Sequence, residues 1–108
     1  MMIKYLILIG LFAAGLGGCA SSHYVETRPD ALVFFLQMDE ASRVRFASST
    51  DQFALHDATR DSSGTWSVTI PLSSEFTYFY LVDGSVYIPE CRFKETDDFG
   101  SENCLYLH

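Results

Sequence analysis

The stretch that most constrains the fold of this chain is residues 76–88, which reads as two β-strands joined by a tight turn. Residues 76–82 are nearly all aromatic or β-branched, and such side chains suit a pleated, half-buried surface. Asp83 and Gly84 form the pair preferred in a two-residue type I′ turn, because both central positions of that turn need positive φ. Alternate side chains of a strand point to opposite faces, and neither face of this strand is polar. We therefore predict a strand inside a sheet, with both of its faces covered or used for binding.

Several other runs have the character of strands. Residues 31–38 are apolar on both faces, as in an inner strand, and residues 43–47 alternate between apolar and basic side chains. Residues 65–72 alternate most clearly, and Pro71 marks a strand end or an edge because it lacks a backbone donor. The side chains predicted to face the core in these two alternating runs are Val44, Phe46, Trp66, Val68, Ile70 and Leu72. With a short closing strand at residues 104–107, the pattern predicts an all-β fold, an antiparallel β-sandwich of about seven strands.

The N-terminal segment has the features of an export signal. Lys4 precedes an apolar run of about a dozen residues, which is shorter than the roughly 20 residues that a membrane span needs. The Leu-Gly-Gly sequence before Cys19 resembles a bacterial lipobox, in which the cysteine is lipidated and becomes the mature N-terminus. We therefore expect residues 1–18 to be a lipoprotein signal peptide; the alternative is an ordinary signal peptide followed by an incidental cysteine. Ala20, rather than Asp, follows the cysteine, and in the Gram-negative lipoproteins that this pattern resembles, that indicates the outer membrane of the cell envelope.

The rest of the chain divides into a linker and a single domain. Residues 19–30 are polar and contain a proline, so we predict a lipid-anchored tether there and a folded domain over residues 31–108. The net charge is −7, and it becomes more negative when Lys4 leaves with the signal peptide. Such an acidic surface argues against nucleic acid and against anionic membrane surfaces, since both are polyanions. The negative charge does not argue against a neutral ligand such as a sugar.

The two remaining cysteines indicate a disulfide. Cys91 and Cys104 form an even pair in an exported, oxidising compartment, where a disulfide is the expected state; the alternative is two free thiols. Closing a loop of about 14 residues contributes roughly 3 kcal/mol to stability in the chain-entropy model. The histidines are His23, His56 and His108, and none has metal-ligand spacing to a cysteine. We therefore predict no metal site and no cofactor.

Four pieces of the domain, in order, resemble a known family. They are residues 41–46, 64–72, 78–84 and 98–103, of which Tyr-Phe-Tyr-Leu-Val-Asp-Gly and the closing Gly-Ser-Glu-Asn are the most specific. This order resembles the glycogen-binding domain of the β subunit of AMP-activated protein kinase. It also resembles the early-set domains that precede branching-enzyme and isoamylase catalytic domains, which together form carbohydrate-binding module family forty-eight. The resemblance covers roughly residues 31–108 and implies an immunoglobulin-like, early-set β-sandwich.

The resemblance also implies a binding face. The family stacks α-glucans on an aromatic platform, because the C–H faces of a pyranose are apolar and its rim is polar. Its first platform tryptophan falls on Phe53, its second falls on Val86, and the lysine of its central strand falls on Phe79. Its closing-loop leucine, threonine and asparagine fall on Phe99, Ser101 and Asn103. Both platform tryptophans and the lysine are thus replaced, and phenylalanine stacks on a sugar more weakly and without a polar handle.

The predicted function follows from this face. The predicted ligand-binding residues are Phe53, Phe79, Phe99, Ser101 and Asn103, and they imply a non-catalytic envelope lipoprotein that binds an α-glucan-like or other glycan. The alternatives are that the rings pack under the loop of residues 48–64, or that they pack on another envelope protein and the sugar site is vestigial. Asn103 has its own alternative, which is to cap the turn at Gly100. We predict no enzyme, because His56-Asp57 has no Gly-x-Ser-x-Gly elbow and no oriented nucleophile to work with.

Overall fold

A computed structural model describes residues 22–108 of this protein; the expected signal peptide and Cys19 lie outside this part. The described residues form ten β-strands and one short 3₁₀ helix, so the predicted all-β fold is confirmed. Among residues 22–108, no helix is long and apolar enough to cross a membrane.

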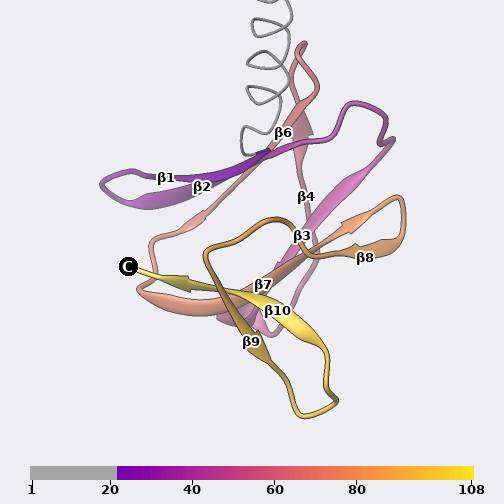
Figure 1. The fold of residues 1–108 in the computed structure, drawn as a ribbon. Helices are drawn as coiled ribbons and strands as arrows, with labels where there is room; N and C mark the ends of the chain where they lie inside the picture. The colour runs from indigo at the N-terminus through magenta and orange to yellow at the C-terminus, as the bar shows by residue number, and fades with distance from the viewer. Residues whose placement is uncertain (1–21) are drawn as a thin grey trace, which may run out of the picture.

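The strands form two antiparallel sheets that enclose one core (Figure 1). The four-stranded sheet contains β1 (His23–Thr27), β2 (Ala31–Gln37), β6 (Thr65–Pro71) and β5 (Thr59–Arg60), in that spatial order. The six-stranded sheet contains β4 (His56–Asp57), β3 (Val44–Ser48), β7 (Glu75–Val82), β10 (Glu102–Leu107) and β9 (Phe93–Thr96), in that order, with β8 (Ser85–Tyr87) paired to β7. This arrangement is a β-sandwich, with β2 and β7 in the interior of their sheets as predicted.

The first strand lies where the sequence predicted a linker. His23–Thr27 forms β1 and pairs antiparallel with β2, so that His23 lies opposite Leu36 and Thr27 lies opposite Leu32. The prediction of a tether over residues 19–30 is therefore wrong for β1. His23 and Val25 face the core, and a histidine in an inward position hides the apolar alternation by which a strand is recognised.

The core between the sheets is rich in aromatic rings. Phe34 of β2 is fully buried, and its ring centroid lies 4.8 Å from that of Phe46 and 4.9 Å from that of Tyr78. The predicted core residues Val44, Phe46, Trp66, Val68 and Ile70 are all buried. Leu72 is exposed, so its predicted inward position is wrong, because β6 already ends at Pro71 and the alternation stops there.

The turn between β7 and β8 fastens a neighbouring loop. Asp83 and Gly84 have φ values of 51° and 87°, as the predicted type I′ turn requires. The Asp83 carboxylate accepts hydrogen bonds from the backbone N–H groups of Ser42 and Arg43, both at 2.8 Å. Hydrogen bonds to a charged acceptor are the stronger kind, so this turn fixes the end of the β2–β3 connection against the hairpin.

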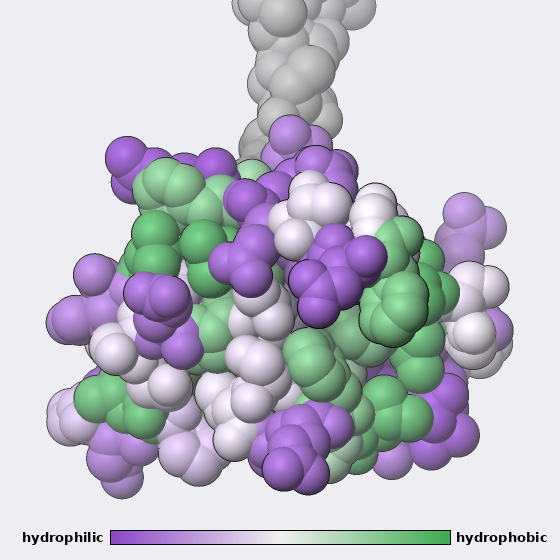
Figure 2. Space-filling model, turned by 90° about the horizontal axis from the view of Figure 1, so that it is seen from below, coloured by the Kyte–Doolittle hydropathy of each residue, from purple (hydrophilic) through white to green (hydrophobic). Residues whose placement is uncertain are grey.

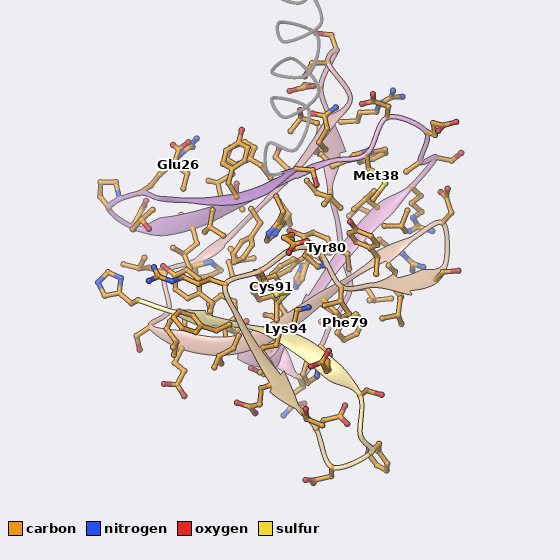
Figure 3. The ribbon with its side chains drawn as sticks, in the orientation of Figure 1. Glu26, Met38, Phe79, Tyr80, Cys91 and Lys94 are labelled. Carbon is orange, nitrogen blue, oxygen red and sulfur yellow. A yellow bond between two sulfur atoms is a disulfide. The ribbon has the colours of Figure 1, made fainter. Side chains whose placement is uncertain are left out.

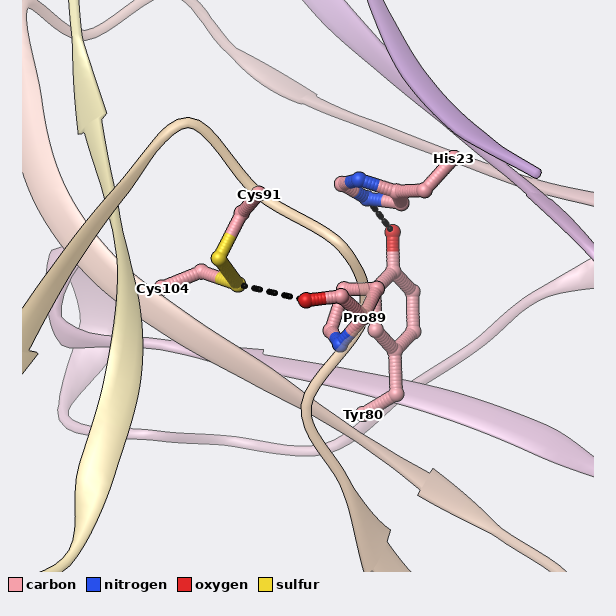
Figure 4. The surroundings of a disulfide bond; sticks show 5 residues. All are labelled: His23, Tyr80, Pro89, Cys91 and Cys104. Atoms are coloured by element: carbon pink, nitrogen blue, oxygen red, sulfur yellow. Dashed lines mark hydrogen bonds between the residues drawn. A yellow bond between two sulfur atoms is a disulfide. The ribbon is translucent and has the colours of Figure 1, made fainter. Parts of the chain in front are cut away.

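A disulfide joins Cys91 to Cys104, as predicted, with the two Cα atoms 5.9 Å apart. Cys104 is fully buried on β10, whereas Cys91 is half-buried in the connection between β8 and β9. The Cys104 sulfur also lies 3.7 Å from the carbonyl oxygen of Pro89, a plain contact because an oxidised sulfur has no proton to donate (Figure 4). The bond therefore fastens the connection after β8 to the core side of the six-stranded sheet.

Candidate functional site

The outer face of the six-stranded sheet carries apolar side chains along its central strand. Thr77, Phe79 and Leu81 of β7 are half-buried and point away from the core, whereas Tyr80 points between the sheets (Figure 3). In the register of β3 and β7, Phe79 lies opposite Ala47, whose small side chain leaves the Phe79 ring room on that side.

A strained loop brings Phe53 onto this face. The loop follows the 3₁₀ helix Ser49–Asp51, and Gln52 and Phe53 have φ values of 61° and 62°. A left-handed conformation costs a non-glycine residue roughly 1–2 kcal/mol, and such strain persists only where the surrounding contacts hold it. Here the backbone N–H of Phe53 donates to the carbonyl of Ser48 at 2.8 Å, which closes the loop. The Phe53 ring then stacks on Phe79, with centroids 5.8 Å apart and planes at 24°, and Phe53 remains 40 % exposed.

Polar side chains anchor the same loop. The hydroxyl groups of Ser48 and Thr50 lie 2.6 Å apart, and the backbone N–H of Thr77 donates to the Ser49 hydroxyl at 3.1 Å. His56 Nε2 lies 2.5 Å from the Asp51 carboxylate. These bonds tie the loop to β7 and β4, which explains how two left-handed residues are tolerated in succession.

His56 and Asp57 do not act as a pair. His56 bonds to Asp51, whereas Asp57 accepts two hydrogen bonds from the Arg43 guanidinium, at 2.9 and 3.3 Å. The hydrogen bond from Arg43 lowers the pKa of the Asp57 carboxyl. Within the described part of the chain, no serine or threonine hydroxyl bonds to His56, and no group of three or more His, Cys, Asp and Glu side chains is arranged to hold a metal ion.

The third predicted ring, Phe99, lies elsewhere. It occupies the turn between β9 and β10, a hairpin that extends beyond the body of the sheet (Figure 1), and it is 94 % exposed. The Asp97 carboxylate accepts the backbone N–H groups of Phe99 and Ser101 at 2.9 and 3.0 Å, so the turn is fastened by its own aspartate. Asn103 of β10 is next to Cys104, which lies opposite Tyr78, so the strand alternation places Asn103 on the outer face beside Phe79. The structure thus brings together Phe53 and Phe79, with Asn103 near them, and sets Phe99 and Ser101 on a separate turn.

Two aliphatic residues that were not among the predicted ligand-binding residues extend the apolar surface. Val86 of β8 is 65 % exposed and lies opposite Leu81 in the hairpin register. The sequence did contain the signal, because a two-residue turn at Asp83 and Gly84 pairs these positions directly. We call Phe53, Phe79, Leu81 and Val86 the outer aromatic face. In the view from below the sandwich, hydrophobic patches alternate with polar ones (Figure 2).

The sequence matches no model of a known protein family. A comparison with curated proteins also finds no match.

Proposed function

We propose that this protein is a non-catalytic binding domain of the cell envelope whose outer aromatic face holds a neutral, α-glucan-like glycan. The observation that carries this proposal is the stack of Phe53 on Phe79, because the chain accepts two strained residues to hold an exposed ring in place. Phe79 supports the Phe53 ring, and the 40 % exposure of Phe53 leaves part of it for a sugar. The choice of ligand rests on the resemblance of the sequence to glycogen-binding domains, in which a platform tryptophan and a lysine stand at these two positions.

The charge of the surroundings supports a neutral ligand. Arg43 is paired with Asp57 at 2.9 Å, and Arg45, which lies opposite Leu81 in one register, lies opposite the same Asp57 in the other, so both cations beside the face have an acidic neighbour. The whole chain has a net charge of −7, which disfavours an anionic ligand. Asn103, beside Phe79, supplies both an amide donor and a carbonyl acceptor, which is what the hydroxyl rim of a pyranose requires.

One observation favours a second candidate, a protein partner. Val86 and Leu81 are aliphatic and lie next to each other at the β8 end of the face. Aliphatic side chains gain no specific stacking geometry with a sugar, but they do pack against the apolar side chains of another protein. In that case the same face docks an envelope protein and binds no glycan.

The proposal includes a lipid anchor at Cys19 in the outer membrane. Because β1 begins at His23, the chain between the anchor and the first strand spans at most about 13 Å, at about 3.3 Å per residue. The domain would therefore sit against the lipid headgroups rather than at the end of a long tether. Mass spectrometry of the native N-terminus tests this: a diacylated or triacylated Cys19 supports it, and an intact or differently cleaved N-terminus contradicts it.

The glycan proposal predicts retardation in affinity electrophoresis. The full chain, in a mild non-ionic detergent, is expected to migrate more slowly through native gels that contain glycogen, amylopectin or pullulan. Phe53→Ala should abolish the retardation because it removes the stacking ring, and Phe79→Ala should do so because it removes the support of that ring. Phe99→Ala is the matched control, since it deletes an equally large ring that makes no part of the stack.

Two results would contradict the proposal that the face binds a glycan. One is the absence of retardation in all three gels. The other is retardation that survives Phe53→Ala, which would mean that the polysaccharide binds elsewhere. Retention of a single envelope protein that Val86→Asp and Leu81→Asp both release would instead support the second candidate.

A further inference from the structure

A second feature of the molecule lies at the side of the sandwich, away from the outer aromatic face. A cavity of about 380 Å³ opens where β1, the connection before β9 and β10 meet. Its most buried lining residues are His23 and Tyr78, and its most exposed ones include Glu90 and Arg92. The cavity therefore has an aromatic interior and a rim that carries one negative and one positive group.

Two neighbouring tyrosines of β7 differ in how their hydroxyl groups are used. The Tyr80 hydroxyl lies 2.9 Å from His23 Nε2 (Figure 4). The His23 ring also hydrogen-bonds to the backbone of Glu90. A neutral imidazole donates one hydrogen bond and accepts one, so we assign Tyr80 as the donor to Nε2 and the other ring nitrogen as the donor to Glu90.

The Tyr78 hydroxyl, by contrast, has no hydrogen-bond partner among the described residues, although Tyr78 is only 3 % exposed. No side-chain nitrogen or oxygen of residues 22–108 is both sealed from solvent and without a partner. The Tyr78 hydroxyl must therefore reach open space, and the space that Tyr78 lines is this cavity. Burial raises the pKa of Tyr78, so the hydroxyl keeps its proton and remains a donor.

We propose that the cavity binds a small, uncharged ring compound whose carbonyl or hydroxyl oxygen accepts a hydrogen bond from Tyr78. The volume lies in the range of small-molecule sites. The rings of His23, Tyr78 and Tyr106 and the side chains of Val25 and Leu105 offer an apolar lining for the body of the ligand. Glu90 and Arg92 oppose each other in charge at the rim, so the entrance favours neither anions nor cations.

A single deep donor distinguishes this ligand from a sugar. Each sugar hydroxyl that is buried without a partner costs free energy, and of the two buried residues in the described lining, His23 and Tyr78, only Tyr78 has an unused side-chain donor. A ligand with one oxygen and an apolar ring satisfies that donor and leaves no polar group unpaired. The cavity therefore differs in chemistry from the outer aromatic face. The proposal of a ligand in the cavity does not depend on the glycan proposal.

Stability measurements test the premise first. Tyr78→Phe deletes a hydroxyl that has no hydrogen-bond partner within residues 22–108, so the midpoint of urea unfolding is expected to stay within experimental error of the wild type. Tyr80→Phe deletes the donor to His23 and is expected to lower the midpoint clearly. Equal destabilisation by the two variants would show that Tyr78 has a structural partner and would overturn the proposal.

Binding is then tested with two probes of similar size, cyclohexanone and methylcyclohexane, of which only the first has an oxygen acceptor. The full chain, with ¹³C-labelled tyrosine rings, is reconstituted in lipid nanodiscs and titrated by NMR. Cyclohexanone is expected to shift the Tyr78 resonance saturably and to bind about fivefold more weakly to Tyr78→Phe, while methylcyclohexane binds both proteins equally. Partition into the lipid is the same for both proteins, so it cancels in the comparison. The proposal would be overturned if cyclohexanone caused no saturable shift. It would also be overturned if Tyr78→Phe weakened the binding of both probes equally.

Discussion

Reduction of the Cys91–Cys104 disulfide is expected to lower the free energy of unfolding by about 3 kcal/mol. The bond joins residues that are 13 positions apart, and opening a loop of this length restores conformational entropy to the unfolded chain. A domain of this size owes only a few kcal/mol to its core, so the loss is a large share of its total stability. The midpoint of thermal unfolding should fall by roughly 15 °C.

The matched control for this experiment is the double variant Cys91→Ala/Cys104→Ala. Its unfolding midpoint should lie near that of the reduced wild type and should not respond to dithiothreitol. Urea unfolding of both proteins, with and without the reductant, gives the comparison. A wild-type midpoint that reductant leaves unchanged, with the thiols shown to be free, would contradict a stabilising role for the bond.

Acidification is expected to weaken the fold through His23. Burial lowers the pKa of this imidazole from 6.5 to about 4, although a hydrogen bond to the backbone of Glu90 partly opposes the change. Between these two values the unfolded chain binds a proton that the folded protein does not, so the free energy of unfolding falls as the pH falls from about 6.5 to about 4. His23 alone contributes about 3 kcal/mol to this loss. Below about pH 4 its protonation lowers the free energy of unfolding no further.

The two tyrosine rings that pack against His23 do not offset this effect. Tyr78 stacks against the ring with centroids 5.9 Å apart, and Tyr80 meets it edge-on at 5.5 Å. Burial raises the pKa of both tyrosines, so neither becomes an anion that would stabilise a charged imidazole. The two tyrosines therefore add no compensating charge to a protonated imidazole.

The variant His23→Gln isolates this contribution. Glutamine hydrogen-bonds but does not titrate, and the surface carboxylates of the two proteins titrate alike. Urea unfolding at pH 7 and pH 4 should show that the wild type loses about 3 kcal/mol more than the variant. Parallel losses in the two proteins would mean that His23 titrates as freely in the fold as in the unfolded chain.

The sequence predicted those parts of the fold that follow from local alternation and turn chemistry. Val68 and Ile70 face the core because a strand of alternating residues buries one face. The hairpin at Asp83 and Gly84 was predicted because few other pairs accept positive φ at both positions. The Cys91–Cys104 bond was predicted because an exported chain with one spare pair of cysteines has one expected pairing.

Features that depend on distant partners could not be predicted in this way. β1 has no strong apolar alternation of its own, and His23 is buried because Tyr80, 57 positions away, bonds to it. The alternation of residues 65–72 by itself extends to Leu72, whereas β6 ends at Pro71, the residue that was predicted to mark a strand end or an edge. Only the sandwich as a whole brings such residues together.

Only part of the candidate site was predicted, because the rest of it also depends on contacts between distant residues. The sequence placed Phe79 on an outer face by alternation, and its resemblance to glycogen-binding domains brought in Phe53 and Phe99. The stack of Phe53 on Phe79 depends on left-handed φ values at Gln52 and Phe53, which no propensity predicts for these residue types. Phe99 projects from a separate hairpin turn because Asp97 closes that turn locally.

The most direct test of the central claim is an NMR titration of the full chain, in nanodiscs and with ¹³C-labelled phenylalanine rings, with maltoheptaose. The outer aromatic face predicts saturable shifts of the Phe53 and Phe79 resonances and none for Phe34, which is fully buried. Phe53 and Phe79 resonances that stay unchanged at millimolar maltoheptaose, or that move no more than Phe34, would contradict the claim that this face holds a glycan.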